Sequence, residues 1–205
     1  MTDKNIVTKI QVCSYQELDD EDRKLVDLAK AATQSSYTPY SHFNVGAAVL
    51  LDNGVMIKGA NQENAAFAGI CAERSACYNA GANYPGVPIV KVAIAAFHNG
   101  DFVEEPCSPC GVCRQALLEF EVHSGKNMAV LLAGRDKIYR LGSIKSLLPL
   151  GFAEFCTCGA PECRDTRAGA GAMWCFGPRP VCVSGRVCCT VSTHDQELAH
   201  AALAG

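Results

Sequence analysis

One segment constrains the fold of this chain more than any other: residues 89–97, Ile-Val-Lys-Val-Ala-Ile-Ala-Ala-Phe, form a nearly continuous apolar run. A run of this length without polar alternation is typical of a strand that is buried on both faces. A sheet that contains such a strand needs a layer of helices over each face. The sequence therefore predicts an α/β fold.

The periodicity of the remaining chain supplies the other elements. Helical spacing predicts helices over residues 22–36, 72–80 and 111–122, and a short one over residues 143–148. Strands are predicted over residues 45–51, 55–60, 128–133 and 138–141, and Asp52-Asn53-Gly54 is a hairpin turn between the first two. Helices on both faces of one sheet are the economical packing for these elements.

Charge and hydropathy exclude several classes of partner. The net charge is −3, so no basic surface is expected to bind a nucleic-acid polymer. The first residues carry charges from Asp3 to Asp20 and no continuous apolar stretch, unlike a secretory signal. No apolar run approaches the roughly 20 residues that cross a bilayer. We expect a cytoplasmic protein with a small soluble ligand and no membrane partner.

The distribution of the cysteines divides the chain. Of 13 cysteines, seven lie between Cys156 and Cys189, in a stretch with no sustained helical or strand period. We interpret residues 1–21 as an N-terminal extension, residues 22–153 as the folded domain, and residues 154–205 as a Cys/Gly-rich irregular tail that is disordered or artefactual. Metal binding by the tail is the alternative, although the spacing of Cys188-Cys189 is poor for zinc.

Two segments of the domain carry cysteines with the spacing of a metal site. Cys71 and the pair Cys110-x-x-Cys113 each stand at the start of a predicted helix. Helix N-termini favour thiolates, the form that binds zinc. Three thiolates would leave the fourth tetrahedral position open, as catalytic zinc requires. Glu73 lies two residues after Cys71, near enough to move a proton at that position without ligating the metal.

Other interpretations of these cysteines remain open. Pro106-Cys107-x-x-Cys110 offers a second register, but its cysteines flank Pro109 in a predicted loop, and we prefer Cys110 with Cys113. Cys107 or a tail cysteine could close a structural four-sulfur zinc site in a binding module. An iron–sulfur cluster is disfavoured, because the fourth cysteine at ferredoxin spacing is missing.

These segments resemble the small, homotetrameric, zinc-dependent cytidine deaminases over most of residues 22–152. The family signature is a Cys-x-Glu element followed by Pro-Cys-x-x-Cys, and Cys71-Ala72-Glu73 with Pro109-Cys110-Gly111-Val112-Cys113 matches it. The resemblance implies a three-layer α/β/α sandwich of the cytidine deaminase type with a mixed five-stranded sheet, one Zn²⁺ per subunit, and a homotetramer. The match extends through Arg74 after Glu73 and through Arg114-Gln115 after Cys113. The other matching segments are Tyr40-Ser41-His42-Phe43-x-Val45-Gly46-Ala47-Ala48, Asn61-Gln62-Glu63-Asn64-Ala65 and Leu147-Leu148-Pro149-Leu150-Gly151-Phe152.

The resemblance also implies roles for single residues. The reaction would be hydrolysis of the exocyclic amine of cytidine or deoxycytidine, with Glu73 moving the protons. Arg74 would offset the charge of the metal thiolates, since three thiolates and Zn²⁺ carry a net charge of −1. The implied substrate-binding residues are Asn61 and Glu63 at the ribose 3′-hydroxyl, Phe43 at the base, Phe67 and Ala72 at the site, and Phe152 in a neighbouring subunit's site.

The substrate class has two rivals at this point. A deaminase of another aminopyrimidine, or of a nucleotide, would use the same metal motif. Asn61 with Glu63 favours a free nucleoside, because a carboxylate there would repel a phosphate.

Overall fold

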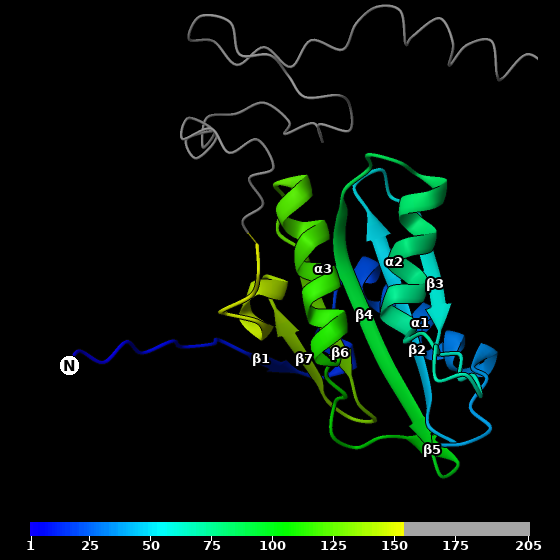
Figure 1. Ribbon diagram of the computed structural model, residues 1–205. Helices are drawn as coiled ribbons and strands as arrows, with labels where there is room; N and C mark the ends of the chain where they lie inside the picture. The colour runs from blue at the N-terminus through cyan, green and yellow to red at the C-terminus, as the bar shows by residue number, and fades with distance from the viewer. Residues whose placement is uncertain (154–205) are drawn as a thin grey trace, which may run out of the picture. The chain divides into compact units, whose positions relative to one another are not determined.

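Strand β4 (Ile89–His98), which holds the long apolar run, lies in the middle of a single mixed sheet (Figure 1). In the computed structural model, which describes residues 1–153, β4 pairs with antiparallel β2 (Asn44–Leu51) on one side and with parallel β6 (Ala129–Ala133) on the other. The strand order is β1-β7-β6-β4-β2-β3, with β3 at Met56–Ala60 and β7 at Ile138–Leu141.

The sheet has two strands more than the five predicted. β1 (Gln11–Cys13) pairs with β7 at one edge, and β5 (Asp101–Phe102) pairs with the end of β4. These strands are only three and two residues long, so neither shows a readable period of two. The predicted α/β fold is confirmed, and the difference is limited to these short additions.

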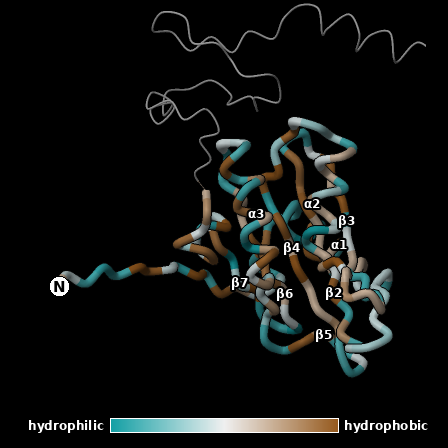
Figure 2. The backbone as a smooth tube through the Cα atoms, viewed as in Figure 1, coloured by the Kyte–Doolittle hydropathy of each residue, from teal (hydrophilic) through white to brown (hydrophobic). Residues whose placement is uncertain are grey.

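Three helices cover the sheet in two layers. α1 (Asp20–Ala32) packs on one face through Leu25, Val26 and Ala29. α2 (Ala72–Asn83) and α3 (Gly111–Ser124) lie side by side on the other face (Figure 1). Alternate residues of β2 enter the two resulting cores, with Val49 on the α2–α3 side and Leu50 on the α1 side. Figure 2 shows the hydrophobic strands enclosed between these layers.

Helix α1 begins two residues before its predicted start. Asp19 is its N-cap, and its carboxylate accepts a hydrogen bond from the Asp22 backbone N–H at 2.7 Å. The 3₁₀ turns of the described residues are η1 (Tyr15–Glu17), η2 (Thr33–Ser35) and η3 (Ile144–Leu147). Residues 154–205, the predicted tail, lie outside the described residues, and the domain limits stay a prediction. Among residues 1–153, no helix has both the length and the apolar character needed to span a bilayer.

Strand direction brings two helix starts to one edge of the sheet. β3, β4 and β6 run in the same direction, because β2 is antiparallel to both β3 and β4, and β4 is parallel to β6. α2 follows the end of β3, and α3 follows the short β5, which pairs with the end of β4. The N-termini of both helices therefore lie near the carboxyl edge of these strands, where open α/β sheets place their binding sites.

Candidate active site

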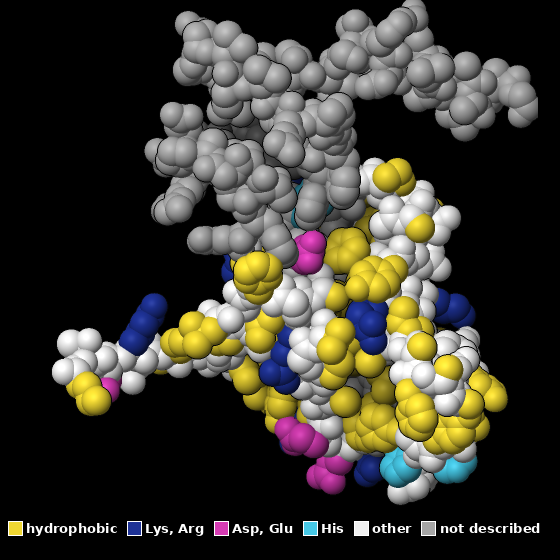
Figure 3. Space-filling model, viewed as in Figure 1, with side chains coloured by type: hydrophobic (Ala, Val, Ile, Leu, Met, Phe, Trp, Pro, Cys, Tyr) yellow, Lys and Arg dark blue, Asp and Glu magenta, His cyan; other side chains and the backbone are white. Residues whose placement is uncertain are grey.

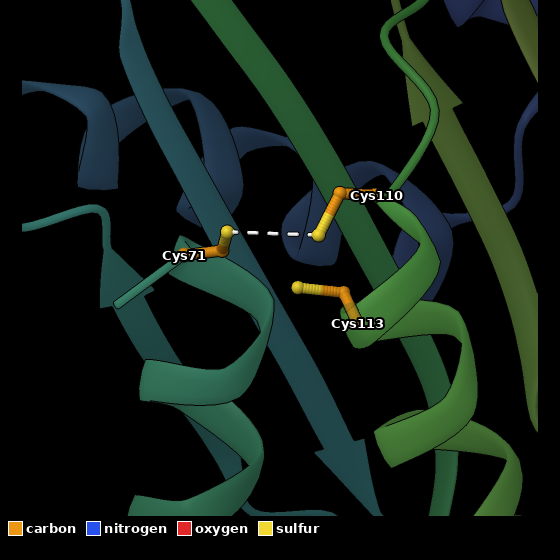
Figure 4. A group of neighbouring side chains, drawn as sticks. All are labelled: Cys71, Cys110 and Cys113. Carbon is orange, nitrogen blue, oxygen red and sulfur yellow. Dashed lines mark hydrogen bonds between the residues drawn. The ribbon is translucent and has the colours of Figure 1, made fainter. Parts of the chain in front are cut away.

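Three cysteine sulfurs converge where α2 and α3 begin. Cys71 is the N-cap of α2, Cys110 is the N-cap of α3, and Cys113 lies in the first turn of α3. Their Sγ atoms all lie within 4.8 Å of one another, and those of Cys71 and Cys110 are 3.8 Å apart. Figure 4 shows the three side chains pointing toward a common centre. Neither N-cap thiol is used as a capping acceptor, so both sulfurs remain available to a ligand.

This donor set fits a zinc ion. Sulfur ligands at about 2.3 Å from tetrahedral zinc lie roughly 3.8 Å from one another, which is the separation of the Cys71 and Cys110 sulfurs. Cys107 is not a member of the group of converging thiols among the described residues. Three thiols with no fourth protein ligand among residues 1–153 match the arrangement of a catalytic zinc site rather than a structural one.

The Arg74 guanidinium interacts with the thiols of Cys71 and Cys113. The pKa of Cys71 is lowered to about 5, chiefly by a hydrogen bond from Cys113 and further by Arg74 and Cys110. Cys113 donates that proton, so its own pKa is raised. Burial alone would lower the pKa of Arg74, but its hydrogen bonds to Cys113 and Cys71 raise it. The Arg74 Nε is buried and has no hydrogen-bond partner in the described residues. The guanidinium is thus placed beside the sulfurs whose negative charge it was expected to offset.

Glu73 is a buried carboxyl beside the thiols. It occupies the first turn of α2, and only 4% of its surface is exposed. Burial is the main reason that its pKa is raised above the usual range. A carboxyl with a raised pKa can both accept and release a proton near neutral pH, which is the property that acid–base chemistry requires.

The loop that carries Cys110 is held by Arg114. The guanidinium donates to the Pro109 carbonyl at 2.8 Å, to the Ser108 hydroxyl at 2.9 Å and to the Leu147 carbonyl at 3.2 Å. These bonds join the loop that carries Cys110 to the segment before Phe152. The sequence showed Arg114 only as part of a motif; its partners lie in two separate segments.

Asn61 and Glu63, the predicted ribose ligands, bind the start of β2 and the loop that precedes it. The Asn61 amide donates to the Phe43 carbonyl at 2.9 Å and accepts from the Val45 N–H at 2.8 Å. The Glu63 carboxylate accepts from the backbone N–H groups of Tyr40 and Ser41, at 2.9 and 3.3 Å, and from the Ser41 hydroxyl. The Ser41 hydroxyl is the main reason that the pKa of Glu63 is lowered.

The predicted aromatic residues differ in their surroundings. The ring of Phe43 lies 5.4 Å from the ring of His98, at the end of β4. Phe67 has a left-handed backbone with φ 58° and is 98% exposed, so its ring lies outside the core formed by residues 1–153. Phe152 is 64% exposed. Ala72 is fully buried in the core under α2, which leaves its backbone, rather than its methyl group, to face a ligand.

Sequence reasoning missed two polar residues near the site. Ser41 contacts Glu63 and also accepts a hydrogen bond from the Phe43 N–H at 3.1 Å. Gln115 binds both backbone polar groups of Phe152. Each was visible only as a letter in a matching segment.

A protein-family model described as the cytidine and deoxycytidylate deaminase zinc-binding region matches residues 19–126. The match spans more than half of the chain and includes the three converging cysteines and Glu73. This chain belongs to the cytidine and deoxycytidylate deaminase family. It is accordingly an enzyme, a hydrolytic deaminase. The resemblance and the enzyme class predicted from the sequence are confirmed.

Individual deaminases match most of the domain. A cytidine deaminase of Sporosarcina psychrophila is 37% identical over 133 residues, which are 64% of this chain and 90% of that protein. One from Halalkalibacterium halodurans is 42% identical over 97 residues, which are 46% of this chain and 68% of that protein. The crystal structure of the Burkholderia pseudomallei cytidine deaminase superposes with a TM-score of 0.52 at 35% identity, covering 63% of this chain and 97% of that one.

Proposed function

We propose that this deaminase holds one zinc ion per subunit and hydrolyses cytidine and deoxycytidine to uridine and deoxyuridine with release of ammonia. The observation that carries the proposal is the convergence of three thiols, from Cys71, Cys110 and Cys113, beside the buried carboxyl of Glu73. The named activity of its relatives, cytidine deaminase, supports the choice of substrate.

The chain's own residues supply the proton transfers. A zinc ion held by the three thiols would act as a Lewis acid that makes water reactive near neutral pH. Glu73 takes a proton from the water that adds to C4 of the pyrimidine and gives it to N3. It then takes the proton of the new C4 hydroxyl and carries it to the amine, so that ammonia leaves and C4 keeps a carbonyl oxygen. One carboxyl serves as base and then as acid, because the proton it accepts is returned. Arg74 balances the charge of the thiolates throughout.

The sugar side of the site favours a free nucleoside. Glu63 is fixed as a carboxylate with a lowered pKa by Ser41 and Tyr40. A negative charge at this place suits a hydroxyl donor and disfavours a phosphate. Cytidine is therefore expected to react faster than its monophosphates, a comparison that also separates this proposal from a nucleotide deaminase.

Apolar side chains on the α2–α3 face support assembly into a homotetramer. Figure 3 shows hydrophobic side chains gathered over these helices. Tyr78 is 47% exposed, Val112 61% and Leu150 83%. Exposed apolar surface of this kind marks a surface that contacts another protein. In the tetramer, Phe152 would enter the site of a neighbouring subunit. The reaction would serve pyrimidine salvage in the cytoplasm.

Replacement of Glu73 by Gln tests the mechanism. Turnover of cytidine, followed by loss of ultraviolet absorbance, is expected to fall by about 10²- to 10⁴-fold, the usual contribution of a general acid–base group. Zinc content, measured by metal analysis, should stay at one per subunit, because Glu73 is not a ligand.

The matched control is Glu119→Gln on α3, a half-buried glutamate whose carboxylate accepts no hydrogen bond from the described residues. This variant should keep the activity of the natural protein. A Glu73→Gln enzyme that turned over cytidine at the natural rate would show the mechanism to be wrong.

A further inference from the structure

We infer that Gln115 is a positioning residue that holds Phe152 for the deamination reaction; this inference rests on the proposed function, in which Phe152 contributes to a substrate site. Gln115 lies on α3 two residues after Cys113, whereas Phe152 comes 37 residues later in the chain. The Gln115 side chain ends in a carboxamide, which carries both a hydrogen-bond donor and an acceptor.

The amide of Gln115 binds both backbone polar groups of one residue. Its Nε2 donates to the Phe152 carbonyl at 2.6 Å, and its Oε1 accepts from the Phe152 N–H at 3.0 Å. Hydrogen bonds on both sides of one Cα fix the backbone from which the side chain projects, as a neighbouring strand would. The direction of the Phe152 Cα–Cβ bond is therefore set from α3.

The exposure of Phe152 indicates that these two hydrogen bonds, here called the Gln115 clamp, do more than stabilise the core. The residue is 64% exposed, so the bonds do not serve to bury its ring in the described fold. Ordering an exposed aromatic residue costs conformational entropy, and it is useful where the ring must meet a second surface. An aromatic ring with a fixed backbone contributes to binding without a further ordering cost.

The adjacent residue strengthens the same connection. Arg114 donates to the Leu147 carbonyl at 3.2 Å and to the Pro109 carbonyl at 2.8 Å. Two neighbouring side chains of α3 thus hold the segment before and at Phe152. The first turn of that same helix carries Cys113. The helix relates Cys113 to the Phe152 backbone as one rigid body, so the distance between this thiol and the Phe152 Cα is fixed within a subunit.

Only an amide can make this pair of bonds at this length. A carboxylate accepts but does not donate, and an ammonium group donates but does not accept. Gln115→Met keeps the length of the side chain and its helix propensity while removing both hydrogen bonds. This variant therefore tests the two hydrogen bonds without disturbing the helix itself.

The experiment compares steady-state kinetics of the full-length zinc enzyme with those of Gln115→Met. The expected result is a KM for cytidine raised about five- to tenfold, as expected for the loss of one to two net hydrogen bonds. The kcat should be unchanged, because a misplaced Phe152 ring weakens binding of the substrate and of the transition state alike. Zinc content and subunit assembly should also be unchanged. Glu119→Ala, one turn further along α3, is the control and should leave KM unchanged.

A double-mutant cycle with Phe152→Ala decides how Gln115 acts. If Gln115 works through the Phe152 ring, Gln115→Met should raise KM in the natural background and have no further effect in the Phe152→Ala background. An equal rise in both backgrounds would overturn the inference, as would dissociation of the assembly or loss of zinc in Gln115→Met alone.

Amide hydrogen exchange at Phe152 gives a readout that does not depend on turnover. Loss of the clamp should speed exchange of this N–H, and unchanged exchange would overturn the inference. If the natural enzyme bound zinc but did not deaminate cytidine, the proposed function would fail, while the exchange rates would still decide whether Gln115 holds Phe152.

Discussion

Ser41 joins two residues that the deaminase reaction is proposed to use. Its hydroxyl donates to the Glu63 carboxylate and accepts from the Phe43 N–H at 3.1 Å. The Tyr40 N–H adds a bond of 2.9 Å to the same carboxylate. Glu63 and Phe43 are therefore oriented by one hydroxyl before any ligand arrives, and orientation in advance reduces the entropy that binding must overcome.

Replacement of Ser41 by Ala should weaken binding of the nucleoside. We expect KM for cytidine to rise about three- to tenfold, since one hydroxyl hydrogen bond to a carboxylate is lost. The kcat should change little, because the thiols and Glu73 are untouched. Ser41→Thr keeps the hydroxyl and is the matched control. Equal KM values for the Ala and Thr variants and for the natural enzyme would refute this role.

At the residue scale, the sequence predicts what depends on short spacing. Cys110 and Cys113 are one helical turn apart, so helix geometry alone suggests their cooperation. Glu73 is only two residues from Cys71, so it is expected near the same site. The contacts of Ser41 and Gln115 bridge 22 and 37 residues of chain. Hydrophobic periodicity carries no information about such pairs, because it indicates the type of a helix or strand and not which distant residues contact it.

The approach of α2 to β3 depends on a glycine. A Cβ added at Gly59 would lie 2.4 Å from the Ala76 backbone nitrogen and 2.6 Å from the Ala72 carbonyl oxygen. Backbone atoms of a helix cannot yield locally to such a contact. Because α2 carries Cys71 and Glu73, the absence of a side chain at Gly59 sets how deep half of the active site lies.

Gly59→Ala is expected to push α2 away from the sheet. Overpacking of this kind costs about 1–3 kcal/mol of the free energy of unfolding, and the displaced Cys71 should lower zinc affinity. Denaturant unfolding and metal analysis measure the two effects. Gly81→Ala, in α2 itself, is the control, since its Cβ would meet Phe120 at an ordinary 3.5 Å. That variant should gain up to about 1 kcal/mol from helix propensity, and a similar loss in both variants would contradict the packing argument.

At the element scale, hydrophobic patterns predict the long strand and the helices. They do not explain why a charged residue, Lys91, stands in the apolar run of β4. Lys91 forms ion pairs with Asp22 at 2.5 Å and with Glu21 at 2.8 Å. Asp22 is fully buried at the start of α1. Lys91 thus connects β4 to helix α1 through these ion pairs. The sequence alone does not show this role, because it does not show that α1 packs against β4.

For the whole molecule, removal of zinc should lower stability. The three thiols belong to two helices, so a bound ion connects α2 to α3 and stabilises the native state by mass action. Treatment with a strong chelator is expected to lower the melting temperature by several degrees, about 2–4 °C for each kcal/mol in a domain of this size. Readdition of zinc should restore it. Equal melting curves with and without metal would contradict a connecting role.

A chain that ends at residue 155 should keep the activity of the full-length protein. Every residue of the candidate site lies within residues 1–153, which form a unit with its own core. Zinc content and cytidine turnover, measured side by side for the two lengths, check this expectation. Loss of either in the shorter chain would show that residues 156–205 contribute to the site.

The position of β4 between the two ligand-bearing helices also sets an order of assembly. Cys71 and Cys110 are 39 residues apart in the chain, and β4 lies between them in sequence. They become neighbours only after β4 has paired with β2 and α3 has folded back over the sheet. Contacts of such long range form late, because loop closure must precede them. A zinc ion held by all three thiols is therefore expected to bind only once the sheet and both helices are in place.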